Sequence, residues 1–401
     1  MIFQATKVSE KVYWVGAIDW GVRDFHGYRT GRGTTYNAYL ILADRITLMD
    51  TVKAPFRDEM LARISSLVDP SKIDFIVSNH SEMDHTGCLP DVIGIVKPDR
   101  VIASVNGRKT LGEHFRRDLG IEAVKDGETL SLGNMKLVFI ETKMVHWPDS
   151  MFSYLPEEEL LFSQDGFGMH LASSERFADE IPDWLLRLEA QRYFANILTP
   201  LSGVIQKTLE KVTALGVPIK VIAPDHGPIW REDVGRVIGW YSEWCAQKPT
   251  GKAVIVYDSM WGATDKMAQV IAEGIAEAGG HPVLMPLGPN HRSDIATEAL
   301  GAGALLVGSP TINGGIFPSV ADVLSYLGGL KPKNLVGAAF GSYGWSGEAV
   351  GQVENLLKEM KVEVVGESVK AKYTPDEDAL VNCRKLGQAI GNRLAEIAAR
   401  T

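Results

Sequence analysis

The amino-acid sequence predicts an α/β protein of two domains, the second of which is a doubly wound parallel sheet. At 401 residues the chain exceeds the length at which one hydrophobic core usually stops growing. Strand-like and helix-like segments alternate regularly over residues 251–401, whereas earlier residues hold mostly short strand-like runs and loops. A polar stretch containing Pro and Gly, residues 245–252, separates the two patterns. We therefore expect domains over residues 1–249 and 250–401.

Charge and hydropathy limit the classes of partner. The formal net charge of -9 argues against a nucleic-acid or anionic membrane surface, because both require clustered Lys and Arg. No apolar run approaches the roughly 18 residues that a membrane helix needs. Residues 1–16 lack the basic start and apolar core of a signal peptide. A cytoplasmic protein without nucleic-acid or membrane partners is expected.

Three cysteines are widely separated in the sequence: Cys88, Cys245 and Cys383. The absence of a C-x-x-C pair excludes a sequence-local zinc ribbon, a rubredoxin-type iron site and a dithiol redox motif. We expect all three side chains to be buried as small hydrophobic groups.

The first domain is expected to contain short strands bounded by Gly, Asp or Asn turns. These runs are rich in Val, Ile, Leu and Phe and cover residues 11–18, 37–43, 45–51, 74–79, 100–105, 136–142, 159–164 and 219–224. The pattern is helical from about residue 174 to residue 215.

Five strands separated by amphipathic helices are expected in the second domain. The strands are residues 252–259, 281–287, 304–310, 335–342 and 361–369. The helices are residues 265–279, 294–300, 318–330, 348–360 and 378–399. In such a sheet the ligand binds beyond the carboxyl ends of the strands, at the topological switch point.

Three loops after these strands carry residues suited to a phosphate and a flat ring. The loop "SMWGAT" (259–264) offers two hydroxyls, a Gly and the start of a helix, but no Lys or Arg. It matches neither a Walker loop nor the G-x-G-x-x-G fingerprint. The loops "SPTINGG" (309–315) and "GSYGWSG" (341–347) add small residues and aromatic rings. A flavin mononucleotide suits this combination.

Residues 250–401 thus resemble flavodoxin. The resemblance implies an FMN phosphate surrounded by the first loop: Ser259, Met260, Trp261, Gly262, Ala263 and Thr264. It implies an isoalloxazine ring surrounded by the other two: Pro310, Thr311, Asn313, Gly314, Ser342, Tyr343, Gly344, Trp345 and Gly347.

In the first domain, four apolar strands are each followed by a His or an Asp. The residues concerned are His80, His146, Asp165 and the pair Asp225 and His226. If the strands share a sheet, these side chains converge at one edge. The first of these segments, "SNHSEMDHTG", also has a plainer interpretation, a solvated turn in which Asp84 or Thr86 caps the helix that follows.

The combined set contains four imidazoles and three carboxylates: His80, Glu82, Asp84, His85, His146, Asp165 and His226. Seven ligands exceed what one tetrahedral zinc can use and suit two metals with a bridging carboxylate. The order H-x-E-x-D-H, then His, Asp and His, resembles the metallo-β-lactamase superfamily, and specifically the flavodiiron proteins (A-type flavoproteins) of the rubredoxin:oxygen oxidoreductase type. Hydrolytic relatives have H-x-H-x-D-H, so Glu82 is the informative departure. An anionic oxygen donor there favours higher oxidation states of iron and redox use.

This resemblance spans essentially the whole chain. It implies a metallo-β-lactamase-like αββα sandwich followed by the flavodoxin-like doubly wound sheet. It assigns two iron ions, the first held by His80, Glu82 and His146. The second is held by Asp84, His85 and His226, with Asp165 as the bridge. In some relatives of the oxygen-reductase type the His that matches His85 turns away from the metal.

Three further residues match positions that line the substrate pocket in the family: His26, His170 and Tyr193. They would donate hydrogen bonds or protons to the bound gas. A surface turn for His26 and helix packing for Tyr193 are the alternatives. Trp147 follows the proposed ligand His146. Its ring could either shield the site or simply pack against neighbouring side chains.

The resemblance implies an enzyme in which FMN accepts electrons from a one-electron carrier and passes them to the diiron pair. Dioxygen would be reduced to water, or nitric oxide to nitrous oxide. No appended rubredoxin or flavin reductase domain is recognised, so a separate donor is expected, rubredoxin first and a deazaflavin second. A head-to-tail homodimer, or a dimer of dimers, would bring each FMN to its partner's metals.

Two other functions are possible. One is a binuclear zinc hydrolase, against which Glu82 and the complete flavin loops argue. The other is a pure electron carrier, which would leave the seven-residue set without a role.

Overall fold

The computed structural model describes residues 3–399, and they form two compact units. Unit 1 runs to Tyr193 and resumes over Gly203–Ser242. Unit 2 consists of Phe194–Ser202 and the chain from Glu243 onward. The chain therefore passes between units inside a helix, α7 (Val234–Ala246), earlier than the polar stretch near Thr250.

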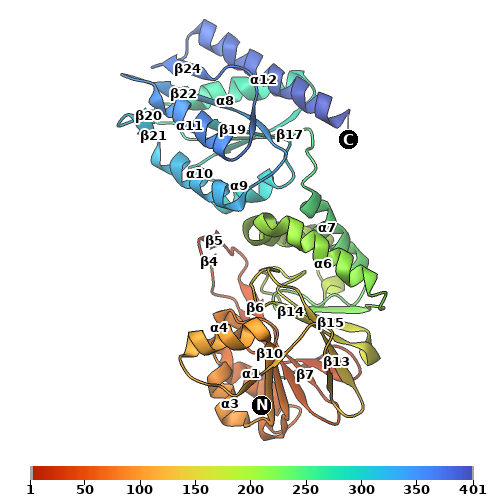
Figure 1. Cartoon of the computed structure of the whole chain (residues 1–401). Coiled ribbons are helices and arrows are strands. Elements are labelled where there is room, and N and C mark those ends of the chain that lie inside the picture. Colours follow the sequence, from red (N-terminus) through yellow and green to blue (C-terminus); the bar gives the residue numbers. More distant parts are fainter. Residues whose placement is uncertain (1–2, 400–401) are drawn as a thin grey trace. The chain divides into compact units, whose positions relative to one another are not determined.

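Unit 1 is built on two sheets (Figure 1). The seven-stranded sheet has the order β1-β2-β7-β8-β9-β10-β11, with β1 (Thr6–Lys7), β2 (Val12–Trp14), β7 (Tyr39–Ile41), β8 (Thr47–Met49), β9 (Phe75–Ser78), β10 (Arg100–Ser104) and β11 (Ile121–Val124). The five-stranded sheet has the order β12-β13-β14-β15-β16, with β12 (Thr129–Ser131), β13 (Lys136–Glu141), β14 (Met151–Leu155), β15 (Leu160–Gln164) and β16 (Val221–Pro224).

Further elements complete unit 1. Two small ribbons pair β3 (Ala17–Asp19) with β6 (Thr34–Tyr36), and β4 (Asp24–Phe25) with β5 (Tyr28–Arg29). The other helices are α1 (Arg57–Ser65), α2 (Met83–Thr86), α3 (Leu89–Val96), α4 (Val105–Phe115), α5 (Asp183–Tyr193) and α6 (Ser202–Ala214). Short 3-10 turns are η1 (Ala54–Phe56), η2 (Pro70–Lys72), η3 (Pro156–Glu158) and η4 (Ala178–Glu180). The π-helix η5 (Phe194–Leu198) and the 3-10 turn η6 (Thr199–Leu201) follow in the chain and belong to unit 2.

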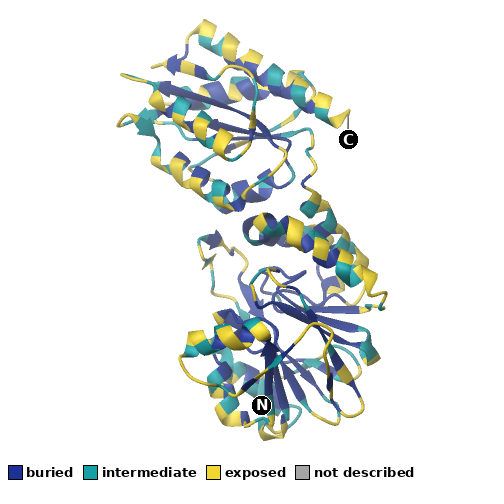
Figure 2. Ribbon diagram, in the orientation of Figure 1, coloured by how far each residue is buried: buried dark blue, intermediate teal, exposed yellow. Residues whose placement is uncertain are grey.

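The layers of unit 1 follow from the alternation of side chains along the strands. Ile41 and Val77 point into a core shared with Leu137 and Phe162 of the second sheet. Neighbouring residues of the first sheet point the other way, to a core built with α1, α3 and α4. On the outer face of the second sheet, Phe152 contacts Phe167, which contacts Tyr241 of α7. The result is the expected αββα sandwich, with the strands buried on both faces (Figure 2).

Unit 2 contains the expected doubly wound sheet. Its order is β18-β17-β19-β22-β23, with β24 also paired to β22, and every one of these pairs is parallel. The strands are β17 (Lys252–Tyr257), β18 (His281–Pro286), β19 (Ala304–Gly308), β22 (Val336–Tyr343), β23 (Glu363–Val364) and β24 (Val369–Lys372), and a small hairpin pairs β20 (Thr311–Ile312) with β21 (Gly315–Ile316). The helices are α8 (Ala263–Glu277), α9 (Arg292–Ala299), α10 (Pro318–Leu330), α11 (Glu348–Glu359) and α12 (Glu377–Ala398).

Helices cover both faces of this sheet. Ala253 and Ile255 belong to a core with α8 and α12, whereas Val254 and Val256 belong to a core with α9, α10 and α11. This two-sided burial explains why β17 is continuously apolar after its first residue, Lys252. The expected fifth strand is broken in two, because Gly366 lies between β23 and β24 with a φ of 73°.

Several local expectations need correction. Cys88 and Cys383 are buried, but Cys245 is only half-buried. Asp84 and Thr86 do not cap α3, because both lie within α2, and among residues 3–399 no side chain caps the start of α3. The sequence also did not reveal β14, although it lies at the centre of the second sheet. Over the same residues no helix is long and apolar enough to span a membrane.

Candidate functional site

The metal-ligand candidates lie beyond the ends of strands that belong to two different sheets. His80 follows β9 of the seven-stranded sheet, whereas His146, Asp165 and His226 follow β13, β15 and β16 of the five-stranded sheet. The assumption of one shared sheet edge is therefore wrong. The side chains nevertheless converge, because the two sheets pack face to face and these strand ends lie at the same end of the sandwich.

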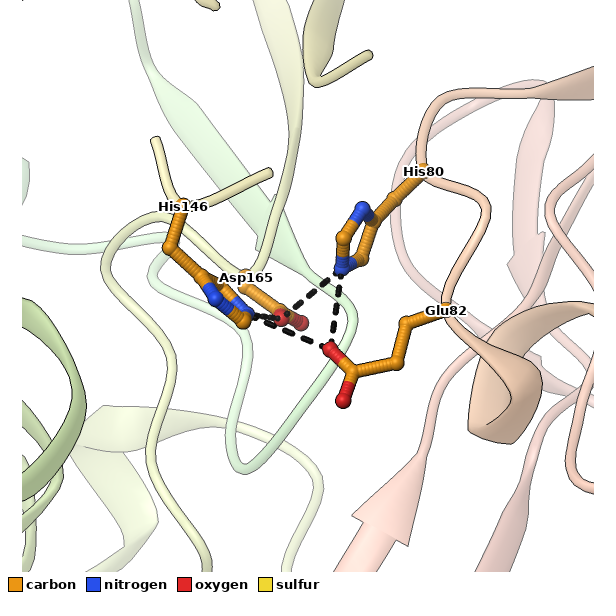
Figure 3. Close-up of side chains that lie close together, drawn as sticks. All are labelled: His80, Glu82, His146 and Asp165. Atoms are coloured by element: carbon orange, nitrogen blue, oxygen red, sulfur yellow. Dashed lines mark hydrogen bonds and ion pairs between the residues drawn. The ribbon is translucent and has the colours of Figure 1, made fainter. Parts of the chain in front are cut away.

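One group of side chains gathers around one oxygen of Asp165 (Figure 3). The Nε2 atoms of His146 and His80 lie 2.7 and 3.4 Å from Asp165 Oδ2. The same two nitrogens lie 3.3 and 3.2 Å from Glu82 Oε2. Two imidazoles and two carboxylates thus direct one atom each toward a common point.

A second group faces the other oxygen of Asp165. The Nε2 atoms of His85 and His226 lie 3.2 and 3.6 Å from Asp165 Oδ1. Asp84 completes the group, with Oδ2 3.2 Å from His226 Nε2 and Oδ1 3.5 Å from His85 Nε2. Asp165 therefore stands between two sets of ligands, one oxygen toward each, which is the arrangement a bridging carboxylate requires.

The pairing of atoms fits a metal centre better than a network of hydrogen bonds. Asp84 Oδ1 and Oδ2, Asp165 Oδ1 and both ring nitrogens of His85 are buried without a hydrogen-bond partner among the described residues. Buried polar atoms are costly when unpaired and are normally satisfied. Three carboxylates and four imidazoles supply the nitrogen and oxygen donors that non-haem iron prefers.

The pKa values of the clustered side chains show that the carboxylates favour positive charge between them. Burial alone would lower the pKa of His80, but the adjacent carboxylates of Asp165 and Glu82 raise it well above its usual range. Burial opposes ionisation of Asp165 too, yet the surrounding imidazoles hold its pKa well below the ordinary value. The pKa of His85 rises to about 9, because Asp84 and Asp165 outweigh its burial. A pair of metal cations would replace these protons.

Outer partners orient the imidazoles. His226 Nδ1 lies 2.6 Å from the carbonyl oxygen of Thr35, which directs Nε2 toward the cluster. Asp225 Oδ2 lies 3.7 Å from His85 Nδ1, and Asp149 Oδ1 lies 4.0 Å from His80 Nδ1. Sequence reasoning missed Asp149. Its position three residues after His146 was the available signal.

His26 lies at the tip of the β4–β5 hairpin. His26 and Gly27 form its two-residue turn with φ angles of 55° and 81°, as a type I′ turn requires. The imidazole is 77% exposed, and its Nε2 lies 3.4 Å from Glu82 Oε1. Both interpretations of His26 therefore apply, because it lies in a surface turn and also contacts the cluster through Glu82.

His170 and Tyr193 are buried beside His226. The His170 ring lies 4.6 Å from that of His226, and the Tyr193 ring lies 5.1 Å from that of His170. His170 Nδ1 lies 2.8 Å from Thr34 Oγ1. Burial and the neighbouring His226 keep the pKa of His170 well below its usual value, so the ring is neutral. Trp147 packs its ring against that of His80 at 5.4 Å.

Unit 2 contains a cavity of about 530 Å³ at the carboxyl edge of its sheet. This volume is within the range of small-molecule sites. The predicted residues that line it are Met260, Trp261, Ala263, Thr311, Asn313, Gly314, Ser342, Tyr343, Gly344 and Trp345. Ser259, Gly262, Thr264, Pro310 and Gly347 stay outside the lining, as far as the described residues define it. Sequence reasoning missed Ile312, Ser346, Tyr373 and Thr374.

The first loop of this cavity has the features of a phosphate cradle. Gly262 adopts a φ of 79° immediately before α8, a helix of 15 residues whose N-terminus therefore begins at the loop. The partial positive charge of that N-terminus favours a phosphate. Thr264 is buried, and its hydroxyl lies 2.9 Å from that of Ser342, so it fixes two of the loops to each other. Cavity and loop together fit FMN.

Comparison with known proteins agrees with this division of the chain. The family model described as Flavodoxin matches residues 255–387. The model described as ODP family beta lactamase matches residues 34–227. Each match falls on one of the two sheet systems. The first includes the residues that line the cavity, and the second includes all seven metal-ligand candidates but not His26.

Relatives match along the whole chain. A nitric oxide reductase of Moorella thermoacetica is 44% identical over 98% of this chain and 100% of its own length. The structure of the rubredoxin oxygen:oxidoreductase of Desulfovibrio gigas superposes with a TM-score of 0.97 at 44% identity, covering 99% of this chain and 100% of the other. The flavodiiron protein of Giardia intestinalis superposes with a TM-score of 0.94 at 34% identity, covering 100% of this chain and 99% of the other. The chain therefore belongs to the flavodiiron protein family.

Proposed function

We propose that this chain is an oxidoreductase that reduces dioxygen to water at a non-haem diiron centre, with electrons supplied through FMN. The observation that carries the proposal is the position of Asp165, whose two oxygens face two separate groups of imidazoles and carboxylates. A flavin-sized cavity on the same chain supplies the second requirement, a route for electrons.

The proposed ligands form two sets, which are the two groups of side chains that face the two oxygens of Asp165. His80, Glu82 and His146 would hold one iron, and Asp84, His85 and His226 the other, with Asp165 between them. When bound, the two irons supply the place where the gas is reduced, and FMN supplies electrons one at a time. Glu82 adds negative charge to the first site, which favours the oxidised states of a redox metal over zinc.

Protons must reach this buried site, because reduction of dioxygen to water consumes four of them. His26 is suited to that task, since its imidazole is largely in solvent while Nε2 lies beside Glu82 Oε1. His170 and Tyr193 are buried and uncharged, so we assign them to orienting the gas by hydrogen bonding and by their shape.

Nitric oxide is the second candidate substrate. A nitric oxide reductase that is 44% identical to this chain supports it, whereas a rubredoxin-oxygen oxidoreductase of the same identity supports dioxygen. Both gases are small and neutral, so the same site could bind either. The donor that we propose is rubredoxin, after the name of the second relative.

We further propose a head-to-tail homodimer, in which the FMN of one chain serves the metals of the other. Exposed apolar side chains beside both candidate sites support it. Met83 and Met144, next to ligand positions, are 44% and 40% exposed, and Trp261 and Trp345 at the flavin cavity are 94% and 95% exposed. A partner chain would remove these surfaces from water.

The decisive experiment begins with metal and flavin analysis of the purified chain. About two irons and one FMN per chain are expected, as for a two-metal site and one switch-point cavity. Oxygen and nitric oxide consumption, each measured with reduced rubredoxin, then assigns the gas. Two zincs without flavin would reject the proposal in favour of a hydrolase, and full cofactor content without gas consumption would leave an electron carrier.

Two variants sharpen this test. Glu82→His restores the H-x-H-x-D-H pattern of hydrolytic relatives and should shift metal content from iron toward zinc. For the dimer, mixing a metal-deficient Asp165→Asn chain with a flavin-deficient chain should restore activity through mixed dimers. Absence of any recovery, with mixed dimers demonstrated, would contradict the head-to-tail arrangement.

A further inference from the structure

The flavin cavity has a fourth wall that none of the three predicted loops supplies. Tyr373 and Thr374 line it and follow directly after β24. Because β24 runs parallel to β22, with Lys372 opposite Tyr343, the chain leaves β24 at the same sheet edge as the other loops. The parallel pairing of β24 with β22 therefore explains why residues 373 and 374 line the cavity.

The backbone of Tyr373 is fixed at the edge of the sheet. Its N–H donates to the carbonyl oxygen of Tyr343 at 2.7 Å, which extends the ladder by one residue. Its φ of 57° lies in the left-handed region, which a tyrosine rarely adopts. A Cβ at Gly344 would lie 3.2 Å from Tyr373 Cε1, so the missing side chain at 344 leaves room for the ring.

The Tyr373 side chain lies largely in solvent. It is 63% exposed, and Trp261 and Trp345 of the same cavity are 94% and 95% exposed. Six large hydrophobic side chains of unit 2 are exposed among the described residues, and four of them line the cavity: Met260, Trp261, Trp345 and Tyr373. Exposed apolar surface gathered in one place indicates a surface that something covers.

We infer that Tyr373 is a flavin-binding residue that contacts the isoalloxazine ring. The inference rests on the binding of FMN in this cavity. A tyrosine side chain has only two rotatable bonds to order on contact, so packing of its ring against a flat aromatic ligand is favourable. Thr374 adds a hydroxyl to the same wall.

Two ligands, FMN and riboflavin, distinguish a contact between Tyr373 and the isoalloxazine ring from an effect on the phosphate loop. Riboflavin has the ring system of FMN but lacks the phosphate. Loss of a ring contact weakens both ligands by the same factor, whereas damage to the phosphate cradle weakens FMN alone. For one aromatic contact the expected factor is about tenfold.

The test uses the full-length chain from which flavin has been removed, titrated with FMN and with riboflavin while flavin fluorescence is recorded. Tyr373→Ala should weaken both ligands about tenfold, and Tyr373→Phe should retain most of the affinity. Ser259→Ala, in the phosphate loop, should weaken FMN more than riboflavin. Leu284→Ala removes an exposed apolar side chain of unit 2 outside the cavity and should change neither.

Each result has one meaning. Unchanged affinity for both ligands in Tyr373→Ala would overturn the inference, and so would a loss confined to FMN. If the alanine variant does not fold, Tyr373→Leu gives the same comparison, because it removes the ring and keeps an apolar side chain. Failure of the unaltered chain to bind FMN would instead reject the flavin assignment itself.

Discussion

The candidate metal centre of unit 1 is assembled from buried charges, whereas the flavin cavity of unit 2 is bordered by exposed rings. Asp165 is 2% exposed and its neighbours are imidazoles and carboxylates, whereas Trp345 is 95% exposed and its neighbours are small or aromatic. Buried charges must be compensated by something specific, and two metal cations do so. Exposed rings need only a flat partner. We therefore expect changes in unit 1 to have larger effects than changes in unit 2.

The largest effect is expected from Asp165→Asn. The amide removes the charge that both ligand groups share, so iron content should fall from about two per chain to well below one, with a loss of activity of more than about a hundredfold. Flavin content should stay the same. The measurement is elemental analysis beside the visible spectrum.

Asp126→Asn is the matched control for that variant. Asp126 is a half-exposed aspartate paired with Lys211 on the surface of the same unit, so iron should be retained. Full iron content in Asp165→Asn would contradict the contrast between the two units, because the negative charge of Asp165 would then not be needed to hold the metals.

His26→Asn should lower turnover by about a hundredfold, at unchanged iron and flavin content, since proton transfer by a positioned side chain contributes at least about that much. Steady-state oxygen consumption is the measurement. Turnover equal to that of the unaltered chain would show that protons enter elsewhere.

Iron binding should strengthen as pH rises, by roughly tenfold per pH unit for each proton that the metal displaces. In the metal-free chain the pKa of His85 is about 9, above its unfolded value, so its contribution to stability is full below about pH 6.5 and is lost as pH rises through 9. Denaturant unfolding of the metal-free chain at pH 6.5 and 9.5 tests this. His85→Gln should reduce the difference between the two values, and an undiminished difference would point to other groups.

The smallest effect is expected from Trp345→Ala, which should weaken FMN retention by about tenfold or less, because a single exposed ring contact is lost. Equilibrium dialysis of flavin measures it. Trp184→Ala, which removes a ring that is 64% exposed in unit 1, is the control. Unchanged affinity in Trp345→Ala would count against its role beside the ring.

The same contrast explains what could be predicted from the sequence. Ligand chemistry is restricted to few residue types, so His80, Glu82 and their partners stand out even though their strands lie in two sheets. The doubly wound sheet was predictable because its strands and helices alternate. β14 was not predicted, because its sequence "MFSYL" directly follows the turn-forming residues "WPDS", which hide where the strand begins. Tyr373 escaped notice because a cavity wall made by an exposed ring has no sequence pattern of its own.

The segment Phe194–Ser202 has a consequence for how this chain can be divided. Asn196 donates to the carbonyl oxygen of Ser293 and accepts from the hydroxyl of Tyr326, so this short piece of chain is part of the second unit although it precedes it by some forty residues. A gene fragment that begins near residue 250 would encode an incomplete module with an uncovered patch. Neither unit is one continuous stretch of the sequence, so a single cut in the chain cannot yield both units complete.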